Sequence, residues 1–206
     1  MALSRTTKNL RFLVILIIAL EIAGIVFHFY QITSLRVIIE GEFVSSAYIN
    51  QISDWSYWQF LLHLALYSSA GLLFLRWSYV SQAGKQFVKS NASKTLNEVM
   101  LLWFVPVLNL FRPAQHIIGF SIKQYLKISD EAIKSYQALI IVWWCMWLVS
   151  GPFGRFLAYL SLPHQSVEQA YTYLIVYVFL EFLSIITGIL FLVILGRQLR
   201  FLRENK

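Results

Sequence analysis

Ionisable side chains recur at helical spacing within three strongly apolar segments of the sequence, at 12–32, 57–75 and 171–195. The polar and small positions are Glu21, Gly24, His28 and Gln31 in the first segment, Gln59, His63, Tyr67 and Ala70 in the second, and Tyr177, Glu181, Ser184 and Gly188 in the last. Steps of three and four residues place each set on one face of a helix. We therefore expect three polar stripes that converge on a common interior, where the small residues permit close helix contact.

Carboxylates and imidazoles at such depth could bind or relay a cation. An ionisable group costs a few kcal/mol in hydrocarbon even on permissive scales, so each one needs a partner or an aqueous cavity. In one interpretation, either glutamate pairs with either histidine and forms a proton or cation path or a small binding site. In the other, these groups only hold the helices together, with the carboxyl groups protonated or hydrogen-bonded. The candidate residues of this polar interior are Glu21, His28, His63, Tyr67, Tyr177, Glu181 and Ser184.

The sequence lacks the motifs of familiar enzyme classes. It contains no Gly-rich phosphate loop, no paired-cysteine metal motif and no nucleophile elbow. No two histidines share the i, i+4 spacing of a helical metal site, and two histidines on separate segments are too few to indicate a haem. The single cysteine, Cys145, cannot form an intrachain disulfide. We predict no catalytic residue, no cofactor and no metal.

The composition indicates that the bilayer is the solvent of this chain. Of its 206 residues, 58% are apolar and only 13% are charged, about half the charged share of an average soluble domain. Four apolar segments have the length that a tilted helix needs to cross, at 12–32, 57–75, 138–156 and 171–195. We predict an all-α integral membrane protein, a bundle of four transmembrane helices that forms one domain over residues 1–206.

The positive charges indicate the orientation in the membrane. If the first helix starts in the cytoplasm, all 17 lysines and arginines except Arg36 and Arg155 lie on cytoplasmic segments. Cytoplasmic loops of membrane proteins carry such an excess. The formal net charge of +7 therefore does not require a nucleic-acid partner, and we predict that both termini are cytoplasmic.

A fifth apolar run, 99–113, is too short to cross the membrane. As a helix it would rise only about 20 Å against a hydrocarbon core of about 30 Å, and Pro106 removes a backbone donor. A full crossing would also move the basic residues after it to the opposite side, so we expect a re-entrant or interfacial insert on the cytoplasmic face. An amphipathic surface helix should follow at 114–130.

The insert is either a structural elbow or a site for lipid or a partner. Its candidate residues, with two from the surface helix, are Trp103, Pro106, Asn109, Arg112, Pro113, Gln115 and Lys123. Irregular backbone at membrane depth has to be buried by protein or reached by water, so the segment from Pro106 to Pro113 should pack against the helices. Asn109 is placed to satisfy backbone groups that are freed there.

The insert also carries a family resemblance. Residues 103–115 read Trp-Phe-Val-Pro-Val-Leu-Asn-Leu-Phe-Arg-Pro-Ala-Gln, which resembles the Trp-Phe-Ile-Pro, Asn-Leu and Pro-Tyr-Gln signature of a bacterial membrane family, domain of unknown function 4328. Asp54 before the second span, Phe74-Leu-Arg-Trp77 at its end and Trp143-Trp144 in the third span agree in order. Ala114 departs from the signature, which has an aromatic residue there. The resemblance covers most of the chain from about Asp54 and implies a bacterial multi-pass membrane protein without an established activity.

Three functions are compatible with these observations. The first is a non-enzymatic component of the bacterial inner membrane that binds lipid or a membrane partner through the insert, the surface helix and the basic cytoplasmic face. The second is a small transporter or channel with a proton or cation path through Glu21, His63 and Glu181. The third is an intramembrane enzyme. The expected partners are membrane lipids, with a membrane protein or a second copy of the chain as further candidates, and not nucleic acid.

Overall fold

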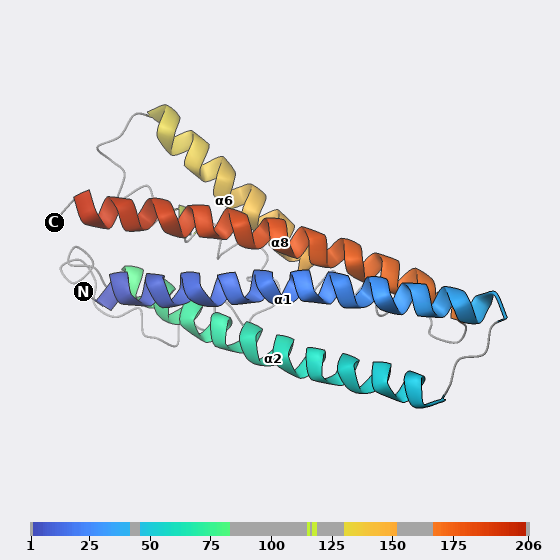
Figure 1. The fold of residues 1–206 in the computed structure, drawn as a ribbon. Helices are drawn as coiled ribbons and strands as arrows, with labels where there is room; N and C mark the ends of the chain where they lie inside the picture. Colours follow the sequence, from blue (N-terminus) through green and yellow to red (C-terminus); the bar gives the residue numbers. More distant parts are fainter. Residues whose placement is uncertain are drawn as a thin grey trace. The chain divides into compact units, whose positions relative to one another are not determined.

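The computed structural model describes residues 2–41, 46–82, 115, 117–118, 130–151 and 167–204 (Figure 1). Four long helices form most of this part: α1 (Ala2–Ile39), α2 (Ser46–Gln82), α6 (Asp130–Ser150) and α8 (Val167–Glu204). Each contains a stretch long and apolar enough to cross a membrane, namely Ser4–Ile39, Asp54–Ser78, Ile133–Ser150 and Gln169–Arg200. No strand occurs in these described ranges. The predicted helical class and the four predicted apolar helices are confirmed.

The helices α1, α2 and α8 are longer than the apolar segments that predicted them. With 38 residues, α1 rises about 57 Å, well beyond a hydrocarbon core of about 30 Å. Hydropathy marks only the apolar middle of such a helix, because polar residues at its ends continue the same backbone hydrogen bonds. The end of α1 is set by Gly41, whose φ of 87° is readily adopted by glycine, and whose amide donates to the carbonyl of Ile38 (3.1 Å).

The third predicted span differs from the structure in position. The sequence predicts residues 138–156, whereas α6 starts at Asp130 and ends at Ser150. Gly151 forms a bend, and its amide donates to the carbonyl of Trp147 (2.8 Å). Residues 152–156 lie outside the described part. Pro152 explains the end of the helix, because the residue before a proline is disfavoured in helical backbone angles.

The predicted insert at 99–113 lies outside the described residues. The candidate residues without a described position are Trp103, Pro106, Asn109, Arg112, Pro113 and Lys123. Gln115, Ile117 and Ile118 are described and helical, with Gln115 exposed and Ile117 buried. A polar outer side and an apolar inner side are expected of an amphipathic helix. The re-entrant or interfacial shape of the insert stays a prediction.

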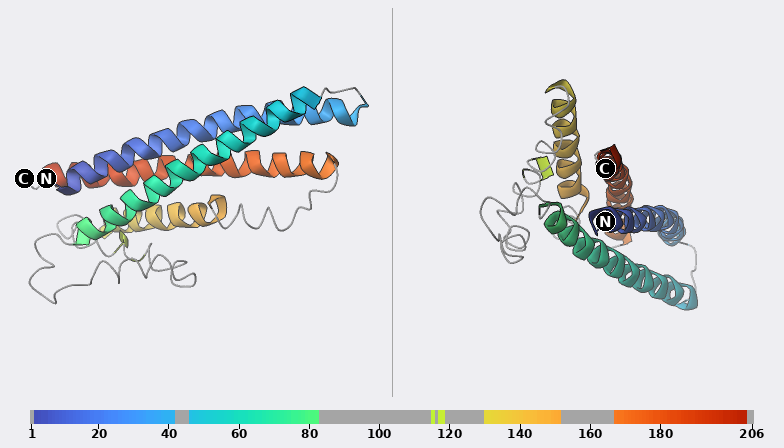
Figure 2. Two further views of the ribbon diagram at one scale, coloured as in Figure 1. Left: turned by 90° about the horizontal axis from the view of Figure 1, so that it is seen from below. Right: turned by 90° about the vertical axis from the view of Figure 1, so that its left-hand side faces the viewer.

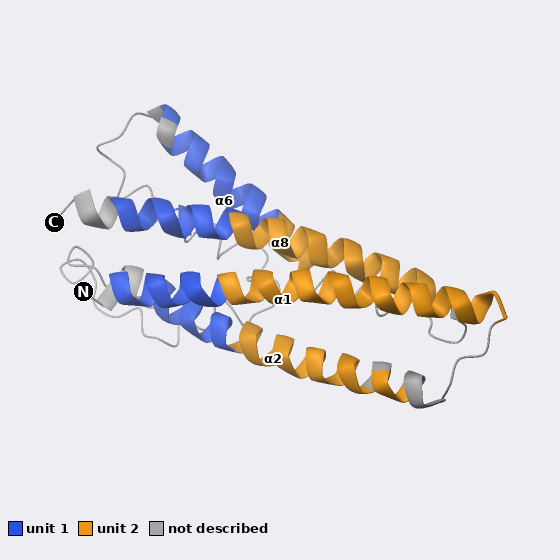
Figure 3. Ribbon diagram, viewed as in Figure 1, with its two compact units in different colours: residues 1–14, 69–145, 190–206 blue, residues 15–68, 146–189 orange. Residues whose placement is uncertain are grey.

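The chain divides into two compact units, and each of the four long helices contributes to both (Figure 3). Unit 1 comprises residues 1–14, 69–145 and 190–206. Its core contains an aromatic cluster in which the rings of Trp143 and Phe191 stack with their centroids 4.8 Å apart. Phe74 brings α2 into this cluster, with its centroid 5.5 Å from that of Phe191. The candidate residues of the polar interior all belong to unit 2.

Unit 2 comprises residues 15–68 and 146–189, and in it the segments of α1, α2 and α8 lie side by side (Figures 1 and 2). Its glutamates Glu21 and Glu181 are only 0% and 1% exposed. Large apolar side chains face outward, among them Val26, Trp58 and Phe179, each more than half exposed. A water-soluble domain shows the opposite arrangement, with carboxylates at the surface. Unit 2 thus buries ionisable groups and exposes hydrocarbon.

Candidate functional site

A buried group of polar side chains from three helices lies in unit 2, and we term it the Glu–His cluster. Its members are Glu21 and His28 from α1, His63 and Tyr67 from α2, and Glu181 and Ser184 from α8. Within each helix the two members are three, four or seven residues apart, so they share one face. The three helix faces that carry polar residues at helical spacing in the sequence therefore meet in unit 2.

Glu21 links all three helices. Its Oε1 atom accepts a hydrogen bond from the Tyr67 hydroxyl of α2 and lies 3.1 Å from Ser184 Oγ of α8. The two hydroxyl oxygens are 2.9 Å apart, so Ser184 donates either to the carboxyl group or to Tyr67. Oε1 therefore acts as an acceptor. The second oxygen, Oε2, lies 3.8 Å from His63 Nε2.

His63 has one ring nitrogen committed to the backbone. Nδ1 lies 2.9 Å from the carbonyl oxygen of Gln59, which can only accept, so Nδ1 carries a hydrogen. A neutral imidazole has a single N–H, and Nε2 then presents a lone pair toward Glu21 Oε2. A lone pair and a carboxylate repel each other unless a proton or another cation lies between them. Nε2 is buried and makes no hydrogen bond.

His28 repeats this arrangement with the other glutamate. The side-chain amide of Gln31 donates to Ser56 Oγ (2.9 Å), which leaves its oxygen to accept from His28 Nδ1 (2.8 Å). His28 Nε2 lies 3.2 Å from Glu181 Oε1, again an imidazole nitrogen against a carboxylate oxygen. The cluster thus contains two imidazole–carboxylate pairs, and a proton or another cation between the two groups of a pair would satisfy both.

Gly24 permits the close approach of Glu181 to α1. A Cβ atom added at Gly24 would lie closer than 3.0 Å to Glu181 Oε1 and 2.7 Å from Gln59 Nε2. The Glu181 carboxylate and the Gln59 amide thus occupy the space that a larger side chain would take at this position. The second carboxylate oxygen, Glu181 Oε2, is buried and has no hydrogen-bond partner. This glutamate keeps an unsatisfied acceptor inside the unit, which is uncommon for a buried polar atom.

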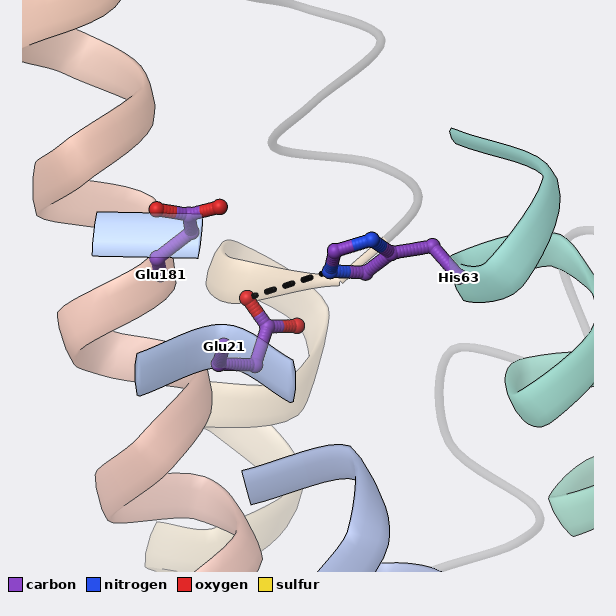
Figure 4. A group of neighbouring side chains, drawn as sticks. All are labelled: Glu21, His63 and Glu181. Carbon is purple, nitrogen blue, oxygen red and sulfur yellow. Dashed lines mark ion pairs between the residues drawn. The ribbon is translucent and has the colours of Figure 1, made fainter. Parts of the chain in front are cut away.

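Glu21, His63 and Glu181 extend toward one another from three different helices (Figure 4). Each offers a ligand atom, and these atoms all lie within 4.8 Å of one another. Imidazole nitrogen and carboxylate oxygen are donors that hold protons and bind divalent transition metals in proteins. The arrangement can therefore hold a cation, either a proton or a metal ion, away from bulk water.

Most of the predicted polar interior is brought together. Helical spacing leaves open which glutamate pairs with which histidine, and the pairs are Glu21 with His63 and Glu181 with His28. Tyr177 contacts the His28 ring edge-on, with the ring centroids 5.9 Å apart. Of the candidate residues of the insert and surface helix, the described one, Gln115, is exposed.

Two polar contacts are not predicted by the sequence. Gln31 donates to Ser56 between α1 and α2, and Ser150 Oγ lies 3.3 Å from Thr187 Oγ1 between α6 and α8. Ser56 precedes the predicted span at 57–75, so hydropathy places it in a loop. Thr187 continues the three-residue step from Glu181 through Ser184, and that spacing is the signal that identifies it.

The sequence also matches a known family over most of its length. The family is described as a domain of unknown function (DUF4328), and the match extends over residues 44–198. The chain belongs to this family. The resemblance carried by the insert and the aromatic segments is thereby confirmed. Neither a curated protein nor a solved structure matches the chain.

The DUF4328 match includes only part of the Glu–His cluster. His63, Tyr67, Glu181 and Ser184 lie within the matched residues, on α2 and α8. Since α1 ends at Ile39, its members of the cluster lie outside them. The DUF4328 description assigns no activity, so a functional proposal has to rest on the chemistry of the cluster.

Proposed function

We propose that this DUF4328 protein is a multi-pass membrane protein that binds a cation in the Glu–His cluster and passes it across the membrane, as a small transporter or channel. The observation that carries the proposal is the presence of two imidazole–carboxylate pairs in unit 2, His63–Glu21 and His28–Glu181. In each pair Nδ1 is committed to an acceptor and Nε2 is directed at a carboxylate oxygen. A cation between the two groups satisfies both of them.

The distribution of polar and apolar residues supports a membrane location. Unit 2 exposes side chains such as Val26, Trp58 and Phe179 and buries its two glutamates. This distribution suits helices whose outer faces contact lipid. An ionisable group within hydrocarbon costs a few kcal/mol, and intramembrane carboxylates and histidines mark substrate paths and proton relays in pumps and transporters. The buried cluster is therefore the best candidate for such a path.

The proposed location is the plasma membrane of a bacterium, with both termini in the cytoplasm. The family resemblance supports the bacterial origin, and the basic residues support the orientation. Arg36 is one of the two cationic residues assigned to the outer side. It forms an exposed ion pair with Glu40 (2.9 Å), so its charge is balanced locally.

A purely structural role is the alternative for the same contacts. Hydrogen bonds between transmembrane helices contribute about 0.6 kcal/mol on average. If the cluster served only to join helices, its buried polar atoms would be expected to use their partners fully. His63 Nε2 and Glu181 Oε2 instead remain without hydrogen-bond partners. These two unpartnered atoms favour a cluster that binds a cation.

Lipid or partner binding by the insert remains a prediction from the sequence. Its residues from Trp103 to Pro113 lie outside the described part of the chain, so the described contacts do not test this binding. The expected partners are still membrane lipids, a membrane protein or a second copy of the chain. Gln115, which follows the insert, is exposed and so is accessible to such a partner.

Cation flux in proteoliposomes tests the proposal, with protons and Zn²⁺ each followed by a trapped indicator dye. Glu181→Gln removes a buried carboxylate at nearly constant size, and flux should fall by about tenfold or more, a barrier increase of at least about 1.4 kcal/mol. Glu40→Gln is the matched control, because Glu40 is exposed and lies just after α1, and its flux should equal that of the wild type. Unchanged flux in Glu181→Gln, or wild-type flux no greater than that of empty liposomes, would contradict transport.

A further inference from the structure

We propose that Glu21, His63 and Glu181 form a binding site for a divalent transition-metal ion of the Zn²⁺ class. This inference rests on the cation binding proposed above and names the cation. The sequence predicts no metal site, because no segment carries two histidines at metal-binding spacing. The three donors come instead from α1, α2 and α8, and folding brings them together.

The donors lie at distances that one small metal ion can bridge. Their ligand atoms are within 4.8 Å of one another, and His63 Nε2 lies 3.8 Å from Glu21 Oε2. Zn²⁺ binds imidazole nitrogen and carboxylate oxygen at about 2.0–2.2 Å, which places two ligands of a tetrahedral site about 3.4 Å apart. A shift of less than about 1 Å in each donor atom closes the difference between 4.8 Å and this spacing.

Each donor is held by a neighbour through one of its two polar atoms. The holding contacts are His63 Nδ1 to the Gln59 carbonyl, Glu21 Oε1 to Tyr67 and Ser184, and Glu181 Oε1 to His28. Metal ligands in proteins are commonly held in this way, because the second contact orients the ligand and sets the histidine tautomer. In His63 this contact reserves Nε2 for the metal.

The donor atoms that these holding contacts leave unused are the ones that a metal would bind. His63 Nε2 and Glu181 Oε2 are both buried, and neither has a hydrogen-bond partner. Glu181 is almost completely buried, so bulk water does not satisfy this oxygen. A buried lone pair without a partner is unfavourable. A metal ion that binds both atoms removes this penalty.

Charge and donor type select the metal. Two carboxylates at one buried site favour a divalent cation over a monovalent one. One nitrogen and two oxygen donors with a fourth position left open suit Zn²⁺ or a neighbouring first-row ion. Ca²⁺ takes about six to eight oxygen ligands, and Mg²⁺ an octahedral oxygen set that includes several waters. Three donors that include an imidazole suit neither ion.

Metal binding by the full chain, purified in detergent and stripped with a chelator, tests this site. Equilibrium dialysis and metal analysis should find one tightly bound Zn²⁺ per chain, retained against excess Mg²⁺ and Ca²⁺. The affinity should fall by about tenfold or more in His63→Gln and in Glu181→Gln. It should stay at the wild-type value in Glu40→Gln, whose glutamate is exposed. X-ray absorption of the wild type should show nitrogen and oxygen ligands at about 2.0–2.2 Å.

The outcomes separate this inference from the transport proposal. A wild-type chain that binds no stoichiometric Zn²⁺, or folded His63→Gln and Glu181→Gln proteins with unchanged affinity, would overturn the metal site. If those variants do not fold, X-ray absorption of the wild type decides: Zn²⁺ without an imidazole ligand would overturn the metal site. Proton flux without Zn²⁺ binding also overturns it and leaves the proposed cation path in place. Zn²⁺ binding without flux supports the metal site and contradicts transport.

Discussion

At the residue scale, the chemistry of the Glu–His cluster depends on which atom of each side chain is already bound. The Gln59 carbonyl determines which nitrogen of His63 carries hydrogen, and the Gln31 amide does the same for His28. Without these acceptors either ring nitrogen could carry the proton, and Nε2 would not be reserved for a carboxylate. The main-chain carbonyl of Gln59 and the side chain of Gln31, both outside the cluster, therefore decide what its histidines can bind.

Removal of the Tyr67 hydroxyl should destabilise the protein. The hydroxyl donates to Glu21 Oε1, which would then keep its contact with Ser184 Oγ (3.1 Å). A lost hydrogen bond costs about 0.5–1.5 kcal/mol, so Tyr67→Phe should lower the unfolding temperature in detergent. Tyr57→Phe on the same helix is the control, because Tyr57 is 59% exposed, and it should unfold as the wild type does. Equal unfolding temperatures for the two variants would show that Glu21 does not depend on this hydroxyl.

An alanine at Gly24 should disturb the cluster through space alone. The added methyl group would displace the carboxylate of Glu181 or the amide of Gln59, so Gly24→Ala should lower the unfolding temperature and weaken Zn²⁺ binding. Gly71→Ala is the matched control in α2, where an added Cβ meets nothing within 4 Å. Alanine is favoured over glycine in a helix by about 1 kcal/mol, so this control should be neutral or stabilising. A Gly24→Ala protein as stable as Gly71→Ala would contradict the close packing.

At the scale of the elements, hydropathy locates the helices better than it locates their ends. A continuous apolar stretch of about 20 residues, as a membrane span would need, predicts a helix that satisfies its own backbone groups, and the four such segments correspond to four helices. The start of α6 at Asp130 has no hydropathy signal, because its first turn is polar.

The aromatic cluster of unit 1 should contribute far more to stability than exposed aromatic residues do. Trp143 is buried and stacks on Phe191, so Trp143→Ala should cost about 3–5 kcal/mol through lost contacts and the cavity left behind. Trp58→Ala is the control, because Trp58 is 67% exposed and loses little packing. Thermal unfolding of both variants in detergent measures the difference. Similar unfolding temperatures would mean that the cluster does not stabilise the fold.

At the scale of the whole molecule, the positive charges predict the side of the membrane on which each terminus lies. All lysines and arginines except Arg36 and Arg155 are assigned to the cytoplasm when both termini are there. A green fluorescent protein fused to the C-terminus should therefore fluoresce, and alkaline phosphatase fused at the same place should be inactive. Phosphatase fused after Gly41, beyond the end of α1, should be active. The reverse pattern would contradict the predicted orientation.

The sequence by itself determines the helical class, the number of apolar helices and the helix faces that carry polar residues. These properties are local, because backbone hydrogen bonds and the period of 3.6 residues depend on near neighbours in the chain. Glu21, His63 and Glu181 can therefore be selected from their spacing and from the cost of placing them in hydrocarbon. The same spacing cannot show that they form one group, because each lies on a different helix.

Only the tertiary structure decides which of these side chains pair. Helical spacing leaves the rotation and axial position of each helix open. A shift of one turn moves a side chain by about 5.4 Å, more than the 3.2 Å that separates His28 Nε2 from Glu181 Oε1. The unpartnered Glu181 Oε2 and the close approach at Gly24 depend on the same register. The physical reason is one of range, since hydrogen bonds and metal ligation act over about 2–3 Å, whereas a sequence pattern positions residues only to within a turn.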